Sequence, residues 1–233
     1  MKDALTSVSF VYFDLDDTLL DHRQAERAAL SDLIREFPDA FGGQDEEHIH
    51  AVYHEVNGRV WAEYADGTRS KEGAKYGRFE LLLGRLPGAL PDAASRMGDA
   101  YLDRYERHWT FIDGALEAFE TTASHTPVGL LTNGFSEVQR KKLARFPDLE
   151  RVARHIVISE EVGVLKPDPL LFAHAAELAD TPPGNILYVG DSERSDVDGG
   201  LGAGWQVAWF GGTDHASDRV WSFRTWREFG DRY

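Results

Sequence analysis

One pattern of apolar residues recurs along the chain: a short continuous run that ends abruptly at polar or glycine residues. It occurs first at residues 8–13 and again at 128–131, 156–158, 186–189 and 207–210. Runs of this length, rich in β-branched and aromatic residues, are typical of strands that are covered on both faces. The pattern therefore predicts five strands of a largely parallel sheet.

Segments with helical periodicity lie between these runs. In the second half of the chain they cover residues 117–122, 136–145, 169–179 and 195–201. Within the third of them, Leu171, Ala175 and Leu178 fall on one helical face. Strands that alternate with helices predict βαβ units with right-handed crossovers, and so an α/β fold with an open parallel sheet and helices on both faces.

The segment from residue 21 to 110 has a different pattern, without strand-like runs. Ala25, Ala29, Leu33 and Phe37 form an apolar stripe at helical spacing. Further helices are expected at residues 46–64, 71–83 and 92–108, separated by segments rich in glycine and proline. We therefore predict an all-helical domain at residues 21–110, inserted into a sheet domain formed by residues 1–20 and 111–233.

Composition and charge limit the classes of partner. A hydrophobic fraction of 42% allows a substantial core, while a formal net charge of −15 disfavours nucleic-acid polymers and anionic membranes. A small anionic substrate remains compatible if local cations bind it. The absence of cysteine excludes disulfides and thiolate metal sites. No apolar stretch approaches 18 residues and the first run is too short for a signal peptide, so we expect a cytoplasmic protein. A monomer and a dimer both stay open.

Acidic residues are concentrated where the first predicted strand ends. Asp14, Asp16 and Asp17 follow its apolar run and precede a hydroxyl at Thr18. Carboxylates this close repel one another and raise each other's pKa unless a cation lies among them or one stays protonated. The cluster therefore indicates a metal site, an acid/base role, or both.

Other strand ends contribute complementary groups. Thr132 and Asn133 follow the second strand, Lys166 lies in a loop before a helix, and Asp191 follows the fourth strand. Ligands of open α/β sheets bind beyond the carboxyl ends of the strands, so these groups should meet the first cluster in one crevice. Asn133 either contributes to binding phosphate or has only a structural role in the turn before Gly134.

Such a set suits transfer of a phosphoryl group to a carboxylate. Mg²⁺ prefers oxygen ligands, and Asp14 and Asp191 could bind it directly. The metal would let Asp14 attack phosphorus as the nucleophile. Asp16 could protonate the leaving oxygen and then activate water, while Thr132 and Lys166 hold the phosphate oxygens.

Four ordered segments, FDLDDTLL, LLTNG, GVLKPDP and YVGDSERSD, with a helical insert after the first, resemble the haloacid dehalogenase superfamily with a C1-type cap. The resemblance implies a Rossmann-like core and a cap that influences substrate choice. It also implies that Asp14 is the nucleophile, and that Asp16 is the acid/base and binds magnesium through its main-chain carbonyl. In the same way it assigns Asp191 to the metal and Asp196 to the support of the metal's water shell.

The resemblance extends to phosphate binding and to the type of reaction. It assigns Thr132 and Lys166 to the phosphate, in agreement with the interpretation from the strand ends. Dehalogenases of the superfamily lack an aspartate two residues after the nucleophile, so Asp16 favours a phosphatase. The segments TNGFSEVQRKKL and VNGRVWAEYADGTRSKEGAKYGRF also resemble nucleotidases that act on pyrimidine and noncanonical nucleoside monophosphates.

In the insert, Asn57, Trp61 and Arg78 are candidates for contact with the substrate. Trp61 could stack on a base and Arg78 could contact an anionic or polar group. The alternative is that Trp61 packs inside the helical domain and Arg78 lies on the surface.

Three other functions remain open. A sugar-phosphate phosphatase or a phosphomutase would use the same nucleophile and cap. A phospho-accepting signalling module would also place acids, a hydroxyl and a lysine around magnesium, but such receiver domains lack an acid two residues after the phosphorylated aspartate and carry no helical insert there.

Overall fold

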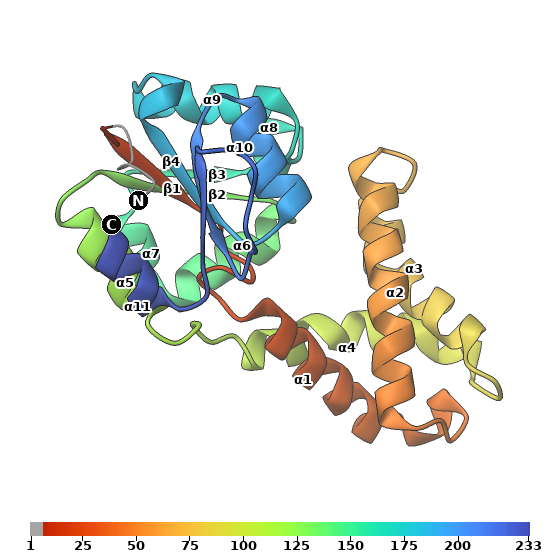
Figure 1. The fold of residues 1–233 in the computed structure, drawn as a ribbon. Helices are drawn as coiled ribbons and strands as arrows, with labels where there is room; N and C mark the ends of the chain where they lie inside the picture. The colour runs from red at the N-terminus through yellow and green to blue at the C-terminus, as the bar shows by residue number, and fades with distance from the viewer. Residues whose placement is uncertain (1–6) are drawn as a thin grey trace. The chain divides into compact units, whose positions relative to one another are not determined.

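The computed structural model describes residues 7–233, which form two compact units (Figure 1). One unit comprises the residues up to Asp21 together with Thr110–Tyr233, and the other is His22–Trp109. The second unit is therefore a single continuous insert in the chain of the first. Among the helices described, none is long and apolar enough to span a membrane.

The first unit is built on a six-stranded sheet in which every neighbouring pair is parallel. From edge to edge the strands are β3 (His155–Ile158), β2 (Val128–Thr132), β1 (Phe10–Phe13), β4 (Ile186–Gly190), β5 (Gln206–Phe210) and β6 (Val220–Phe223). The predicted parallel α/β sheet is thus confirmed. It has one strand more than the five expected.

Alternation along the central strand explains why its apolar run is continuous. Phe10 and Tyr12 pack on one face of the sheet with Phe172, whereas Val11 and Phe13 pack on the other face with residues of several helices. Both faces are therefore covered, and a polar residue within β1 would have to be buried on either side.

Helices cover both faces, as Figure 1 shows. Those of the sheet unit are α5 (Ala115–Ala123), α6 (Ser136–Arg145), α7 (Pro147–Val152), α8 (Ser159–Val162), α9 (Pro169–Ala179), α10 (Gly199–Gly202) and α11 (Trp226–Arg232). One face packs against α5, α6, α7 and α11, and the other against α9. The helix expected at residues 195–201 is instead a π-helical turn, η4 (Glu193–Asp198), followed by α10.

The sixth strand and the last helix come from the tryptophan-rich end of the chain. Trp221 and Phe223 of β6 join Trp226 and Phe229 of α11 in one cluster on the α5 face. These aromatic side chains complete the edge of the sheet and part of its core.

The second unit contains helices and no strand over residues 22–109, all of which are described. Its helices are α1 (His22–Glu36), α2 (Glu46–Ala65), α3 (Lys71–Arg85) and α4 (Ala94–Arg107). Asp45 caps α2 and Ser70 caps α3, each by accepting from a backbone N–H in the first turn. The helix expected from residue 92 begins two residues later, because Pro91–Ala93 forms the separate 3₁₀ turn η2.

Candidate active site

The strand order places the acid cluster at a topological switch point. From β1 the chain continues to β2 and β3 on one side, and then returns to β4 on the other side of β1. Asp14 directly follows β1 and Asp191 directly follows β4, and the backbone N–H of Asp14 donates to the carbonyl oxygen of Val189 at 2.8 Å. Open α/β sheets bind their ligands at this position.

A compact loop then turns the chain away from β1. The backbone N–H groups of Leu19 and Leu20 both donate to the carbonyl oxygen of Leu15, and Asp17 adopts a left-handed conformation with φ of 58°. Aspartate tolerates this conformation better than most residues. Because the backbone leaves the strand here, Asp16 is freed from strict alternation and its side chain is directed to a different set of partners from those of Asp14.

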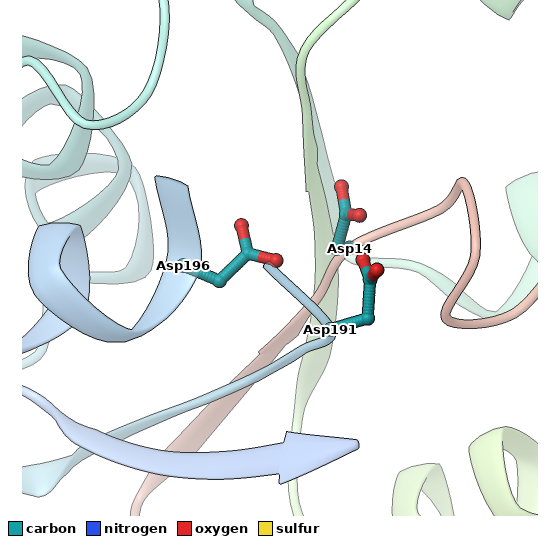
Figure 2. A group of neighbouring side chains, drawn as sticks. All are labelled: Asp14, Asp191 and Asp196. Atoms are coloured by element: carbon teal, nitrogen blue, oxygen red, sulfur yellow. The ribbon is translucent and has the colours of Figure 1, made fainter. Parts of the chain in front are cut away.

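Three carboxylates converge at the switch point (Figure 2). One oxygen each of Asp14, Asp191 and Asp196 lies within 4.8 Å of the others. Figure 2 shows the Asp196 carboxylate directed from η4 toward the side chains of Asp14 and Asp191, which follow strands. Asp14 and Asp196 are buried, and Asp191 is half-buried.

Lys166 is the cation at this centre. Its Nζ lies 2.7 Å from Asp14 Oδ1 and 2.8 Å from Asp196 Oδ1. It also donates to the hydroxyl of Tyr188 at 2.6 Å, and that hydroxyl in turn donates to a backbone carbonyl. Burial disfavours the ammonium, but the two carboxylates outweigh burial and raise the pKa of Lys166 above its ordinary value.

The acid cluster acts on the pKa of Asp14. Burial raises that pKa well above its usual range, Lys166 opposes the rise, and the Asp196 and Asp191 carboxylates add to it. Clustered carboxylate oxygens of this kind fit a hard divalent cation such as Mg²⁺.

The predicted phosphate-binding residues take two different positions. Thr132 ends β2, and its hydroxyl is buried. The side chain of Asn133 instead bonds the backbone of Lys166: its Oδ1 accepts from the Lys166 N–H at 2.8 Å and its Nδ2 donates to the Lys166 carbonyl at 3.1 Å. Asn133 thus fixes the loop that carries Lys166, which corresponds to the structural role left open by the sequence.

Two residues of α6 that sequence reasoning missed contact Asp16. Lys142 Nζ lies 2.6 and 2.7 Å from the two carboxylate oxygens of Asp16, and Gln139 Nε2 lies 3.0 Å from one of them. Both helix residues are buried. Gln139 and Lys142 are three residues apart on α6, so both side chains can reach the same carboxylate.

The candidate residues of the helical unit differ in exposure. Asn57 and Arg78 are buried and bonded to each other, with Arg78 Nη1 3.3 Å from Asn57 Oδ1. Asn57 also donates to Glu26 at 2.7 Å, and the Arg78 guanidinium lies 5.3 Å from the centre of the Tyr101 ring. The expected alternative of a surface position for Arg78 is therefore wrong. Trp61 is half-buried and packs edge-on against Tyr64.

Residues 9–204 match the model of the haloacid dehalogenase-like hydrolases. The chain belongs to this family, and the resemblance found in its four ordered segments is thereby confirmed.

Two similar proteins are named for activities on phosphate esters. The chain is 30% identical to the pyrimidine 5′-nucleotidase YjjG of Escherichia coli, over 86% of this chain and 84% of that protein. It is 28% identical to the phosphoserine phosphatase of Thermus thermophilus, over 87% and 88% of the two chains. The protein is accordingly an enzyme, a phosphatase of this superfamily.

A solved structure shares the fold over nearly the whole length. The HAD-hydrolase YfnB of Bacillus subtilis, in a crystal form bound to magnesium, superposes with a TM-score of 0.80 at 24% identity, covering 97% of this chain and 98% of that one. At this identity the likeness establishes the fold alone.

Proposed function

We propose that the protein is a magnesium-dependent phosphomonoesterase that works through an aspartyl-phosphate at Asp14 and acts on a small phosphorylated metabolite. The observation that carries this proposal is the position of Asp14: a buried carboxylate at the switch point, beside two further acids and the Lys166 ammonium. On this proposal the sheet unit is the catalytic core and the helical unit is the cap.

Asp14 and Asp191, with the main-chain carbonyl of Asp16, would hold the metal, and Asp196 would support its water shell. When bound, the cation would reduce the repulsion among the carboxylates and draw phosphate oxygens toward the site. The choice of cation is in line with the YfnB crystal form, which is bound to magnesium.

The residues of the chain then divide the reaction between them. A carboxylate oxygen of Asp14 attacks phosphorus while the bond to the ester oxygen breaks, and Asp16 gives its proton to that oxygen. In the second half, Asp16 takes a proton from water, the water oxygen attacks phosphorus, and the bond between phosphorus and Asp14 breaks. Lys166 and Thr132 hold phosphate oxygens throughout.

For the substrate we propose a nucleoside 5′-monophosphate, in line with the relative that is a pyrimidine nucleotidase. The similarity to a phosphoserine phosphatase at nearly the same identity keeps other small phosphate esters as alternatives. Sugar phosphates and isomerisation by a phosphomutase belong to the same set.

Phosphate release from a panel of nucleoside monophosphates, sugar phosphates and phosphoserine tests the proposal. Each substrate is assayed with magnesium and with EDTA, and isomerised product is measured beside free phosphate. We expect many phosphates released per protein molecule, loss of activity with EDTA, and no turnover by Asp14→Asn despite an unchanged fold. Normal hydrolysis by Asp14→Asn would disprove the assigned nucleophile, and a single long-lived phosphoryl adduct would favour the signalling module.

A further inference from the structure

The buried ammonium of Lys142 contacts both carboxylate oxygens of Asp16. Lys142 lies on α6, and its Nζ is 2.6 and 2.7 Å from Oδ1 and Oδ2 of Asp16. The side chain of Lys142 is only 2% exposed, whereas that of Asp16 is 23% exposed. The lysine thus approaches Asp16 from the protein interior and leaves part of the carboxylate accessible.

Gln139, one helical turn earlier, ties Asp16 to the proposed phosphate site. Its Nε2 lies 3.0 Å from Asp16 Oδ2, 2.8 Å from Thr132 Oγ1 and 3.1 Å from the carbonyl oxygen of Asn133. This one amide group therefore links the proposed acid/base to the proposed phosphate-binding hydroxyl.

Gly134 leaves the space that the Gln139 side chain occupies. A Cβ atom on Gly134 would lie 2.8 Å from Gln139 Nε2 and 3.0 Å from its Cγ, closer than packed atoms tolerate. Glycine at residue 134 therefore lets the glutamine reach across the end of β2.

Burial of an ammonium is unfavourable, because its removal from water costs several kcal/mol unless a well-placed partner offsets that cost. Leu143, its neighbour on the same helix, packs in the core of the sheet unit. An apolar residue at position 142 could extend that packing without any charge. The contact with the Asp16 carboxylate therefore explains a lysine at position 142 better than the stability of α6 does.

We propose that Lys142 and Gln139 are positioning residues: together they fix the orientation of the Asp16 carboxylate for proton transfer and couple it to Thr132. This inference rests on the proposed role of Asp16 as the acid/base. Fixing the donor matters because proton transfer requires hydrogen-bond distance to the leaving oxygen, and a displacement of about 1 Å can cost on the order of 10²-fold in rate.

The test uses two substrates whose leaving groups differ in their need for a proton. An alkyl phosphate, a nucleoside monophosphate that the wild type hydrolyses, needs protonation of its leaving oxygen, whereas p-nitrophenolate leaves without it. For Lys142→Met we expect kcat/KM on the alkyl ester to fall about 10- to 100-fold, a fraction of the roughly 10²–10⁴-fold that general acid catalysis supplies. On p-nitrophenyl phosphate the loss should stay within about threefold.

A double-variant cycle and a matched control complete the design. Lys142→Met should cause little further loss in an Asp16→Asn background, since both changes remove the same contribution. Lys141→Met removes a lysine from the same helix at an exposed position and should leave both substrates unaffected. If Lys142→Met fails to fold, Gln139→Leu replaces it, with the same preferential loss on the alkyl ester expected.

An equal loss on both substrates, or additive effects of the Lys142 and Asp16 changes, would overturn the positioning role and leave Lys142 a structural ion pair. Different results refute the proposed function and the positioning role. A wild-type protein that releases no phosphate refutes the proposed function itself. An Asp16→Asn variant that loses both substrates equally refutes only the acid/base assignment, and the positioning role with it.

Discussion

The ammonium nitrogen of Lys166 lies 2.7 Å from a carboxylate oxygen of Asp14, although 152 residues separate the two in the chain. Both side chains are buried, so water does little to solvate either charge. The same ammonium contacts Asp196 of η4, and its own loop is fixed by Asn133 after β2. The Lys166 side chain therefore connects the end of β1 to η4, while its backbone is held at the end of β2. Its contribution to stability can be separated from its contribution to catalysis.

Replacement of Lys166 by methionine should strongly destabilise the metal-free protein. The change leaves the buried carboxylates of Asp14 and Asp196 without their ammonium, and breaking a buried ion pair typically costs about 3–5 kcal/mol. Urea denaturation in EDTA at neutral pH measures the free energy of unfolding. The exposed Lys141→Met should change it by less than about 0.5 kcal/mol. A loss below about 1 kcal/mol for Lys166→Met would contradict the role of Lys166 as the principal counter-charge.

Asp191→Asn should have the opposite effect on the metal-free protein. The Asp191 carboxylate adds to the repulsion that raises the pKa of Asp14, so its neutralisation should stabilise the fold by about 1 kcal/mol, as is common when a functional site gives up its activity. Magnesium should raise the Tm of the wild type, because it binds only the native site, and should not raise that of the variant. An equal rise in both proteins would exclude Asp191 as a metal ligand.

The sequence predicted the sheet, the acid cluster at its carboxyl edge and the position of Lys166 beside that cluster, because these depend on local signals. An apolar run covered on both faces indicates a parallel strand, and parallel strands bring their ends together. β6 was missed because its short run is interrupted by Ser222 and follows a polar segment.

The contacts of Lys142 and Gln139 could not be predicted in the same way. Charged residues on a helix usually face solvent, and only the packing of α6 against the end of β2 shows that these two face inward. Likewise, nothing local distinguished Arg78 as a buried residue, since its partners Asn57 and Tyr101 come from two other helices. Partners distant in sequence decide such positions.

Gly190→Ala should disturb the acid cluster without any change of charge. A Cβ atom at residue 190 would lie 2.6 Å from Cγ and 2.7 Å from Cβ of Asp196. Overpacking of this kind costs about 1–3 kcal/mol and should displace Asp196 from Lys166. We expect a loss of stability in urea and a higher magnesium concentration at half-maximal activity. Gly202→Ala, where a Cβ meets nothing within 4 Å, is the matched control and should alter neither quantity. Unchanged magnesium dependence in Gly190→Ala would show that Asp196 does not support the metal.

Asn57 and Trp61 of the helical unit should differ in what their replacement changes: stability for Asn57 and substrate preference for Trp61. Asn57 bonds both Glu26 and Arg78 in a buried position, so Asn57→Ala should cost about 1–3 kcal/mol of stability through unsatisfied polar groups.

Trp61 is half-buried, and stacking of a base on an aromatic ring contributes about 1–3 kcal/mol. Trp61→Ala should therefore lower kcat/KM for a nucleoside monophosphate roughly five- to 150-fold relative to phosphoserine, which has no base. Melting temperatures beside kcat/KM for both substrates measure the two effects. A Trp61→Ala variant that loses activity equally on both substrates would place this tryptophan in the packing of the helical unit instead.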